Sequence, residues 1–157
     1  MTMKDWQKII LFLAIPLFIG FFGSLFMSEL SMIWYASLDK AFFNPPNWLF
    51  GPAWTLLYIL MGYSGYLIWQ SKKSKLQKTT KELYVSQLII NAAWTPIFFG
   101  NTSLVGGLIT IILLDLAVIF TIIYSYKINK KASYLLIPYL LWILFATILN
   151  ISLLVLN

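Results

Sequence analysis

Five long apolar segments, separated by short polar stretches, dominate the pattern along the chain. Segments of about 20 apolar residues are long enough to cross a bilayer, where the backbone satisfies its own hydrogen bonds as a helix. Only Asp115, in the fourth segment, places a charge inside one of them. The pattern predicts an all-α membrane protein, a five-helix transmembrane bundle that forms one domain over residues 1–157. Its helices are expected at residues 9–27, 48–70, 83–100, 104–126 and 132–156.

Composition supports this reading and excludes several kinds of chemistry. Apolar residues make up 61% of the 157 residues and charged residues 10%, whereas a soluble domain has about 45–50% and about 25%. The chain contains no cysteine and no histidine. Disulfides, thiol nucleophiles, zinc sites and histidine-ligated haem are therefore excluded, as is a serine–histidine–aspartate triad. No metal site and no required cofactor are expected.

The lysines indicate how the chain crosses the membrane. Ten of them precede the first segment or lie in the connections at 71–82 and 127–131, and Lys40 alone lies in the connections on the other side. Because cytoplasmic loops carry an excess of lysine, the N-terminus is expected in the cytoplasm and the C-terminus outside, in a prokaryotic cell membrane. The net charge of +6 then reflects topology, with anionic lipid as an alternative partner and no nucleic acid implied.

The connection at residues 28–47 differs from the others. It has about 20 residues, rich in aromatic residues and prolines, and a loop of that length in a compact protein is usually functional or disordered. Its aromatic side chains, Trp34, Tyr35, Phe42 and Phe43, favour order. The sequence therefore predicts an ordered aromatic loop with a short helix at 32–40.

Specific motifs in and after this loop point to a known family. The loop contains WYASLDK at 34–40 and NPPNW at 44–48, followed by GPAW at 51–54, LY at 57–58 and MGY at 61–63. Further matches are Gln87, Asn91, Trp94, Pro96, FFG at 98–100, Leu136, PYL at 138–140, Trp142, FA at 145–146 and LN at 149–150. Together they resemble the TspO/MBR family of tryptophan-rich sensory proteins and translocator proteins, also called peripheral benzodiazepine receptor-like, over about residues 34–150.

The resemblance implies a membrane protein that binds flat hydrophobic molecules between its helices, chiefly protoporphyrin and haem, and benzodiazepine-type drugs or cholesterol in mammalian members. It implies tetrapyrrole handling, transport or stress signalling. Two alternatives remain: light- and oxygen-dependent protoporphyrin degradation, with Trp54 and Trp142 as catalytic residues, and facilitated lipid or sterol transport. The implied ligand-binding residues, with the loop from Trp34 to Trp48 as a lid, are Trp34, Tyr35, Trp48, Trp54, Tyr58, Asn91, Trp94, Trp142, Ala146 and Leu149.

Two departures from the family pattern lie in the loop, where Ala41 replaces a usual proline and Phe43 a common tryptophan. The basic, aromatic C-terminal extension linked to cholesterol in mammalian relatives does not follow the matched region. Cholesterol is accordingly not the first expected ligand.

Helical spacing tests whether the implied residues can share a cavity. Trp54 and Tyr58 are four residues apart, and Asn91 and Trp94 are three apart, so that each pair lies on one helix face. In the last segment, Trp142, Ala146, Leu149 and Asn150 form one stripe. Such faces suit a cavity with aromatic walls. The alternative is ordinary helix packing and interfacial anchoring, where tryptophan and tyrosine also gather.

Polar and small residues inside the segments carry further expectations. A carboxyl group such as that of Asp115 is costly in the bilayer, so we expect it to bond to a neighbouring helix, with a proton- or ligand-linked role as the alternative. Asn150 is expected to bond a neighbouring helix, and Asn91 either a helix or a ligand. Gly20 and Ser24 are spaced for close helix approach, in a homodimer or within one chain.

Overall fold

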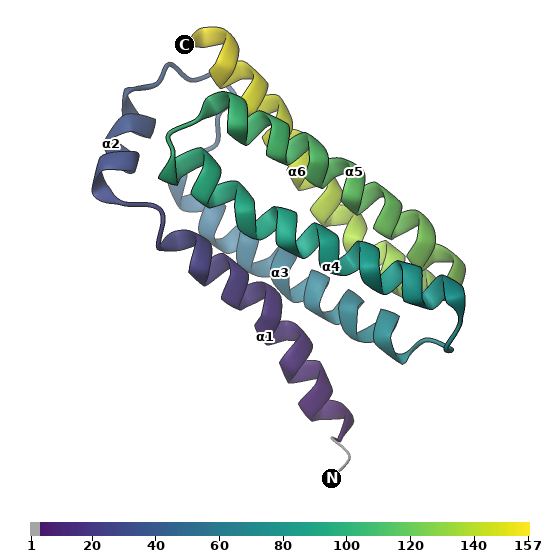
Figure 1. Ribbon diagram of the computed structural model, residues 1–157. Helices are drawn as coiled ribbons and strands as arrows, with labels where there is room; N and C mark the ends of the chain where they lie inside the picture. The colour runs from purple at the N-terminus through teal and green to yellow at the C-terminus, as the bar shows by residue number, and fades with distance from the viewer. Residues whose placement is uncertain (1–3) are drawn as a thin grey trace.

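The computed structural model describes residues 4–157, which are helical apart from short connections (Figure 1). The elements in chain order are α1 (Asp5–Ser24), α2 (Glu29–Ser37), α3 (Asn47–Gln70), α4 (Lys75–Thr95), the π-helical turn η1 (Pro96–Gly100), α5 (Leu104–Ile128) and α6 (Lys130–Leu156). Residues 32–40, expected to hold a short helix, overlap α2, which begins at Glu29 and ends at Ser37.

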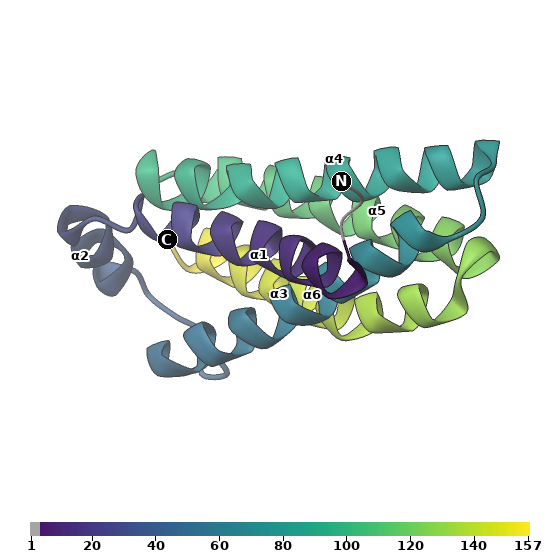
Figure 2. The same ribbon diagram turned by 90° about the horizontal axis from the view of Figure 1, so that it is seen from below.

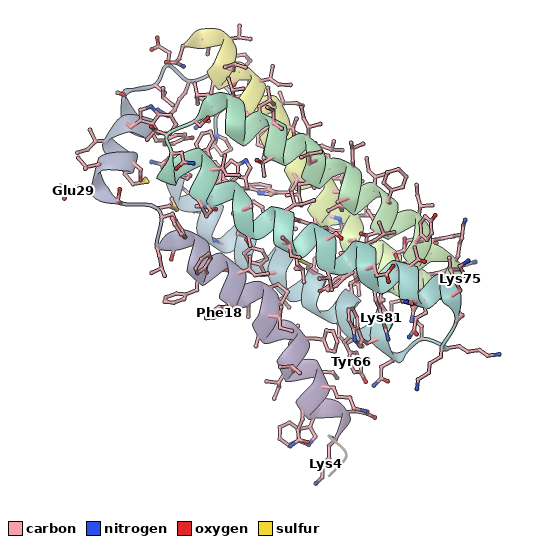
Figure 3. The ribbon with its side chains drawn as sticks, in the orientation of Figure 1. Lys4, Phe18, Glu29, Tyr66, Lys75 and Lys81 are labelled. Carbon is pink, nitrogen blue, oxygen red and sulfur yellow. The ribbon has the colours of Figure 1, made fainter. Side chains whose placement is uncertain are left out.

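The five long helices form a bundle, and α2 stands at one end of it (Figure 1). Helix α5 packs against α4 and α6, while α3 packs against α1 and α6. Helix α1 lies across α3 and also touches α4, as the view from below shows (Figure 2). Lys75 and Lys81 lie at the end opposite α2, whereas Glu29 of α2 lies at the other end (Figure 3).

Within residues 4–157, four helical stretches are long and apolar enough to cross a membrane: α1, α4 continued through η1, α5 and α6. Helix α3 has 24 residues and no charged side chain, but it is not among the four. Its tryptophans, tyrosines and glycines lower its mean hydropathy, although they do not prevent burial in a bundle. The chain is thus an all-helical, multi-pass membrane protein.

The third expected helix begins earlier than the hydropathy pattern indicated. Helix α4 starts at Lys75, because Ser74 caps it by accepting a hydrogen bond from the Gln77 backbone N–H at 3.1 Å. The Gln77 side-chain amide donates to the carbonyl of Ser71 at 2.7 Å and so ties the connection to the end of α3. The lysine-rich stretch 75–81, expected as part of a solvated connection, is therefore helical.

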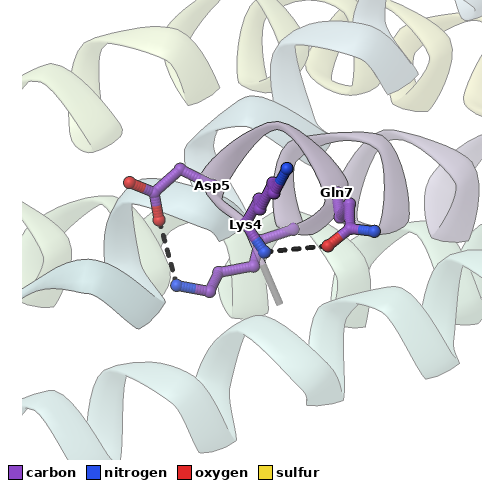
Figure 4. A network of polar contacts seen from close by, with 4 residues as sticks. Lys4, Asp5 and Gln7 are labelled. Atoms are coloured by element: carbon purple, nitrogen blue, oxygen red, sulfur yellow. Dashed lines mark hydrogen bonds and ion pairs between the residues drawn. The ribbon is translucent and has the colours of Figure 1, made fainter. Parts of the chain in front are cut away.

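The start of α1 also precedes the expected boundary at residue 9. The helix begins at Asp5, whose carboxylate pairs with the Lys8 ammonium at 3.0 Å. The Lys4 backbone N–H donates to the side-chain oxygen of Gln7 at 2.8 Å (Figure 4). These polar contacts extend the helix beyond its apolar segment, which a hydropathy pattern does not detect.

Helices α1, α3 and α4 approach closely at two glycines of α3. A Cβ atom on Gly62 would lie 2.6 Å from the Phe12 carbonyl oxygen of α1, and one on Gly65 would lie 2.5 Å from the Tyr84 hydroxyl oxygen of α4. The Tyr84 hydroxyl donates to the carbonyl of Met61 at 2.9 Å. The bundle is therefore tightly closed in the half that lies away from α2.

Polar side chains inside the bundle are mostly bonded to protein. The Thr147 hydroxyl of α6 lies 2.7 Å from the Asp115 carboxyl group of α5, so the expected bond of Asp115 to a neighbouring helix is confirmed. The Asn150 amide instead donates to Ala146 of its own helix at 2.9 Å. A Cβ on Gly20 would meet the Tyr58 ring, so this small residue serves packing within the chain.

Candidate ligand-binding cavity

A cavity of about 460 Å³ lies in the half of the bundle nearest α2. Every helix of the chain contributes to its wall, with α2 at one end and the faces of α1, α3, α4, η1, α5 and α6 around it. The tight contacts at Gly62 and Gly65 lie beyond its other end. The space thus lies between these tight contacts and α2.

Eight of the ten residues implied by the family resemblance line this cavity: Tyr35, Trp54, Tyr58, Asn91, Trp94, Trp142, Ala146 and Leu149. The other two lie outside its lining. The Trp34 ring packs edge-on against Phe98, with ring centroids 5.5 Å apart, and Trp48 is 71% exposed. The structure therefore brings together residues from four helices, and the first and last of them, Tyr35 and Leu149, are more than 100 positions apart in the sequence.

Helix α6 provides one continuous side of the cavity. Trp142, Ala146, Leu149 and Asn150 all line it, as their helical spacing requires. The methyl group of Ala146 stands between the larger side chains on this face, and its small volume leaves room at the centre of the wall.

One polar group of the cavity wall is an asparagine held by two tyrosines. The Tyr58 hydroxyl of α3 donates to the side-chain oxygen of Asn91 at 3.1 Å. The Asn91 amide in turn donates to the Tyr139 hydroxyl of α6 at 2.8 Å. These bonds fix the orientation of the amide and join three helices. Asn91 thus bonds to neighbouring helices and lines the cavity at the same time.

Aromatic rings form much of the remaining wall and are held by their own contacts. Trp94 stacks on Phe98 with ring centroids 4.9 Å apart and an angle of 12° between the rings, and its indole N–H donates to the Gly107 carbonyl at 3.2 Å. The Trp54 ring lies 5.3 Å from that of Tyr58. The cavity therefore presents fixed, flat apolar surfaces.

Helix α2 lies over the end of the cavity, and contacts of the loop after it hold this end of the chain in place. Tyr35 lines the cavity and packs against Phe99 with ring centroids 5.6 Å apart. The Lys40 ammonium donates to the carbonyl of Tyr35 at 2.6 Å and lies 4.7 Å from the centre of its ring. Asp39 and Asn157 exchange hydrogen bonds of 2.9 and 3.0 Å, which fasten the loop to the end of α6.

Burial affects the Tyr35 hydroxyl at this end of the cavity. Desolvation raises the pKa of the Tyr35 hydroxyl above its usual value, and a hydrogen bond with Asn44 opposes the rise. Tyr35 therefore stays neutral at physiological pH.

The cavity wall carries no formal charge. Its lining contains no lysine, arginine, aspartate or glutamate, and over residues 4–157 no group of three or more acidic residues is placed to hold a metal ion. The wall can therefore enclose an apolar molecule and offer it uncharged hydrogen-bonding groups, and it holds no acid–base pair for hydrolysis.

Helix α1 supplies cavity residues that the motifs did not indicate. Leu17, Gly20, Phe21 and Ser24 line the wall, and they follow the spacing of one helix face. The sequence signal for α1 was the pair of small residues at 20 and 24, from which we predicted only close packing between helices. Met32 of α2 and Phe50 of α3 also line the cavity without a motif of their own.

Comparison with known proteins agrees with this architecture. The model of the TspO/MBR family matches residues 12–156. The chain is 46% identical to the tryptophan-rich protein TspO of Archaeoglobus fulgidus, over 96% of this chain and 97% of that protein. It is 37% identical to the human translocator protein, over 92% and 87%. It is 33% identical to the tryptophan-rich sensory protein of Cereibacter sphaeroides, over 98% and 93%. The chain belongs to the TspO/MBR family.

Proposed function

We propose that this protein binds flat, porphyrin-like tetrapyrroles in the cavity and acts in their handling, transport or stress signalling. One observation carries the proposal. Indole rings from three different helices, Trp54 of α3, Trp94 of α4 and Trp142 of α6, line a single uncharged space. A planar conjugated ligand is the partner that such walls accommodate.

The size of the cavity and its aromatic wall favour a planar aromatic ligand. The volume of about 460 Å³ falls within the range of about 300–1,000 Å³ that small-molecule sites occupy. Each aromatic pair adds about 0.5–1.5 kcal/mol beyond the burial of its area. Tyr58 and Asn91 supply a fixed polar point on the mainly apolar wall, which would orient the ligand.

The absence of histidine and cysteine from the chain leads to a prediction about iron. Tyrosine and methionine are the remaining groups that could coordinate haem iron, so stacking and apolar enclosure should dominate binding. We expect metal-free protoporphyrin to bind at least as tightly as haem. Equilibrium titration of the purified protein in detergent measures both affinities. Strong haem binding with none of the free base would contradict the proposal.

We further propose that α3 crosses the membrane with the other four long helices. Its 24 residues carry no charge, and it packs lengthwise between α1 and α6. Five crossings place the N-terminus and both lysine-rich connections in the cytoplasm and α2 outside, in a prokaryotic cell membrane. The cavity then lies in the outer half of the bilayer.

A second candidate function is light-driven breakdown of protoporphyrin. Trp54 and Trp142 line the same cavity from facing helices, where both could donate electrons to an excited porphyrin with oxygen as the oxidant. This candidate predicts that light removes porphyrin absorbance only when protein is present, and that Trp54→Phe or Trp142→Phe abolishes the loss. Unchanged loss in both variants would eliminate it.

A further inference from the structure

The cavity has a side opening between α1 and α3, in addition to its covered end. Three residues of α1 and three of α3 line the cavity and are exposed: Leu17, Phe21, Ser24, Asn47, Gly51 and Thr55. Because a Cβ on Gly51 would also meet no atom within 4 Å, we place these residues at the rim of an opening. The wall is therefore interrupted along one flank of the bundle.

Glycine contacts explain why the two helices close at one end and part at the other. Beside Gly62, the backbones of α3 and α1 touch, because a Cβ would lie 2.8 Å from the Leu13 Cα. Nearer α2, Gly20 of α1 lies against the Tyr58 ring, and this contact marks the end of the opening that is farther from α2. Beyond it, a Cβ on Gly51 would meet nothing within 4 Å, so the flank there is open.

The opening lies along the apolar length of both helices and not beyond their ends. From Asn47 to Thr55 an α-helix rises about 12 Å, which is less than half of a hydrocarbon core about 30 Å thick. On the α1 side, Phe21 at the rim is 63% exposed. Ser24 and Asn47 add polar groups at the end of the opening nearest α2. The residues at the rim are thus apolar in the part nearer the bilayer centre and polar in the part nearer the membrane surface.

We infer that the ligand enters the cavity sideways from the bilayer, through the opening between α1 and α3, without passing α2 at the end of the cavity. The inference rests on the proposed function, and it narrows the ligand to planar, apolar molecules that dissolve in lipid. Helix α2 then stays fixed over the end of the cavity, in agreement with the hydrogen bonds of Lys40 and Asn157 that hold α2 and the loop after it. Such a ligand would keep its polar substituents toward Ser24 and Asn47 while its ring system slides in.

The natural absence of cysteine allows a sharp test. Thr55→Cys places a single thiol on the rim, and Leu56→Cys places one on the next residue, which is exposed but does not line the cavity. Each variant, reconstituted in liposomes, is treated with a bulky apolar methanethiosulfonate that a reducing agent later removes. Stopped-flow quenching of tryptophan fluorescence then measures the association rate of protoporphyrin before modification, after it and after reduction.

We expect modification at residue 55 to slow association about tenfold, with recovery after reduction, and modification at residue 56 to leave the rate within about twofold. An equal rate before and after modification at residue 55, or an equal slowing at both positions, would overturn the side entrance while leaving the cavity as the binding site. Wild-type protein that shows no saturable quenching would overturn the proposed function, and the side entrance with it.

Discussion

Replacing Ala146 by tryptophan is expected to weaken protoporphyrin binding about 100-fold, which corresponds to about 2.7 kcal/mol. Ala146 lies on the cavity face of α6 between Trp142 and Leu149, so a bulky ring there occupies the space that the ligand needs. The measurement is an equilibrium titration in detergent, followed by the absorbance of the bound porphyrin.

Ile148→Trp is the matched control, because it adds a similar ring to the same helix on a side chain that is 53% exposed and does not line the cavity. Its affinity should stay within about twofold of the wild type. Equal losses in both variants would mean that the effect comes from α6 as a whole. An unchanged affinity in Ala146→Trp would place the ligand elsewhere.

Gly62→Ala is expected to lower the thermal stability of the protein strongly for so small a change. The new Cβ would lie 2.6 Å from the Phe12 carbonyl oxygen and 2.8 Å from the Leu13 Cα, and both are backbone atoms that cannot swing away. Overpacking of this kind typically costs about 1–3 kcal/mol. For a domain of this size we expect a fall of about 3–10 °C in the unfolding midpoint in detergent, measured by circular dichroism.

Gly51→Ala provides the control on the same helix. Its Cβ meets no atom within 4 Å, and alanine is favoured over glycine in a helix by about 1 kcal/mol. The midpoint should therefore stay the same or rise slightly. A similar fall in both variants would show that the backbone contact between α1 and α3 is not a principal source of stability.

The membrane-spanning helices were predictable because charge is rare within them. A long segment without charge has few alternatives in lipid, which is why α5 and α6 begin within two residues of the expected boundaries. The beginning of α4 was not predictable in this way. Lysines favour a solvated connection in a hydropathy pattern, yet capping by Ser74 and the bonds of Gln77 make the same residues helical.

The cavity was predictable in part. Spacing places Trp142, Ala146 and Leu149 on one face, but it does not say whether that face meets a partner helix or a space. The difference depends on the angle between helices, which is set by contacts such as that of Gly62 with α1. The contribution of α1 was missed for the same reason, since its exposed Phe21 reads as a lipid-facing residue until the neighbouring helix is placed.

Trp34 and Trp48 illustrate a limit of motif reasoning. Both belong to the expected aromatic loop, yet Trp34 lies in α2 and packs on Phe98, whereas Trp48 lies in the first turn of α3 and is exposed. The orientation of α2 and of the loop after it is set by tertiary contacts, among them the hydrogen bonds between Asp39 and Asn157. This tie could not be found from sequence spacing, because Asn157 lies 118 positions from Asp39.

The most direct test of the cavity as the ligand site uses two variants that divide the seven tryptophans into the three that line the cavity and the four that do not. One variant keeps Trp54, Trp94 and Trp142 and replaces the other four by phenylalanine, while the complementary variant replaces only these three. Titrated with protoporphyrin in detergent, the first should lose nearly all its fluorescence along a one-site curve. The second should show only the weak, unsaturable quenching of porphyrin dissolved in the micelle. Saturable quenching of equal depth in both variants would contradict enclosure of the ligand between these helices.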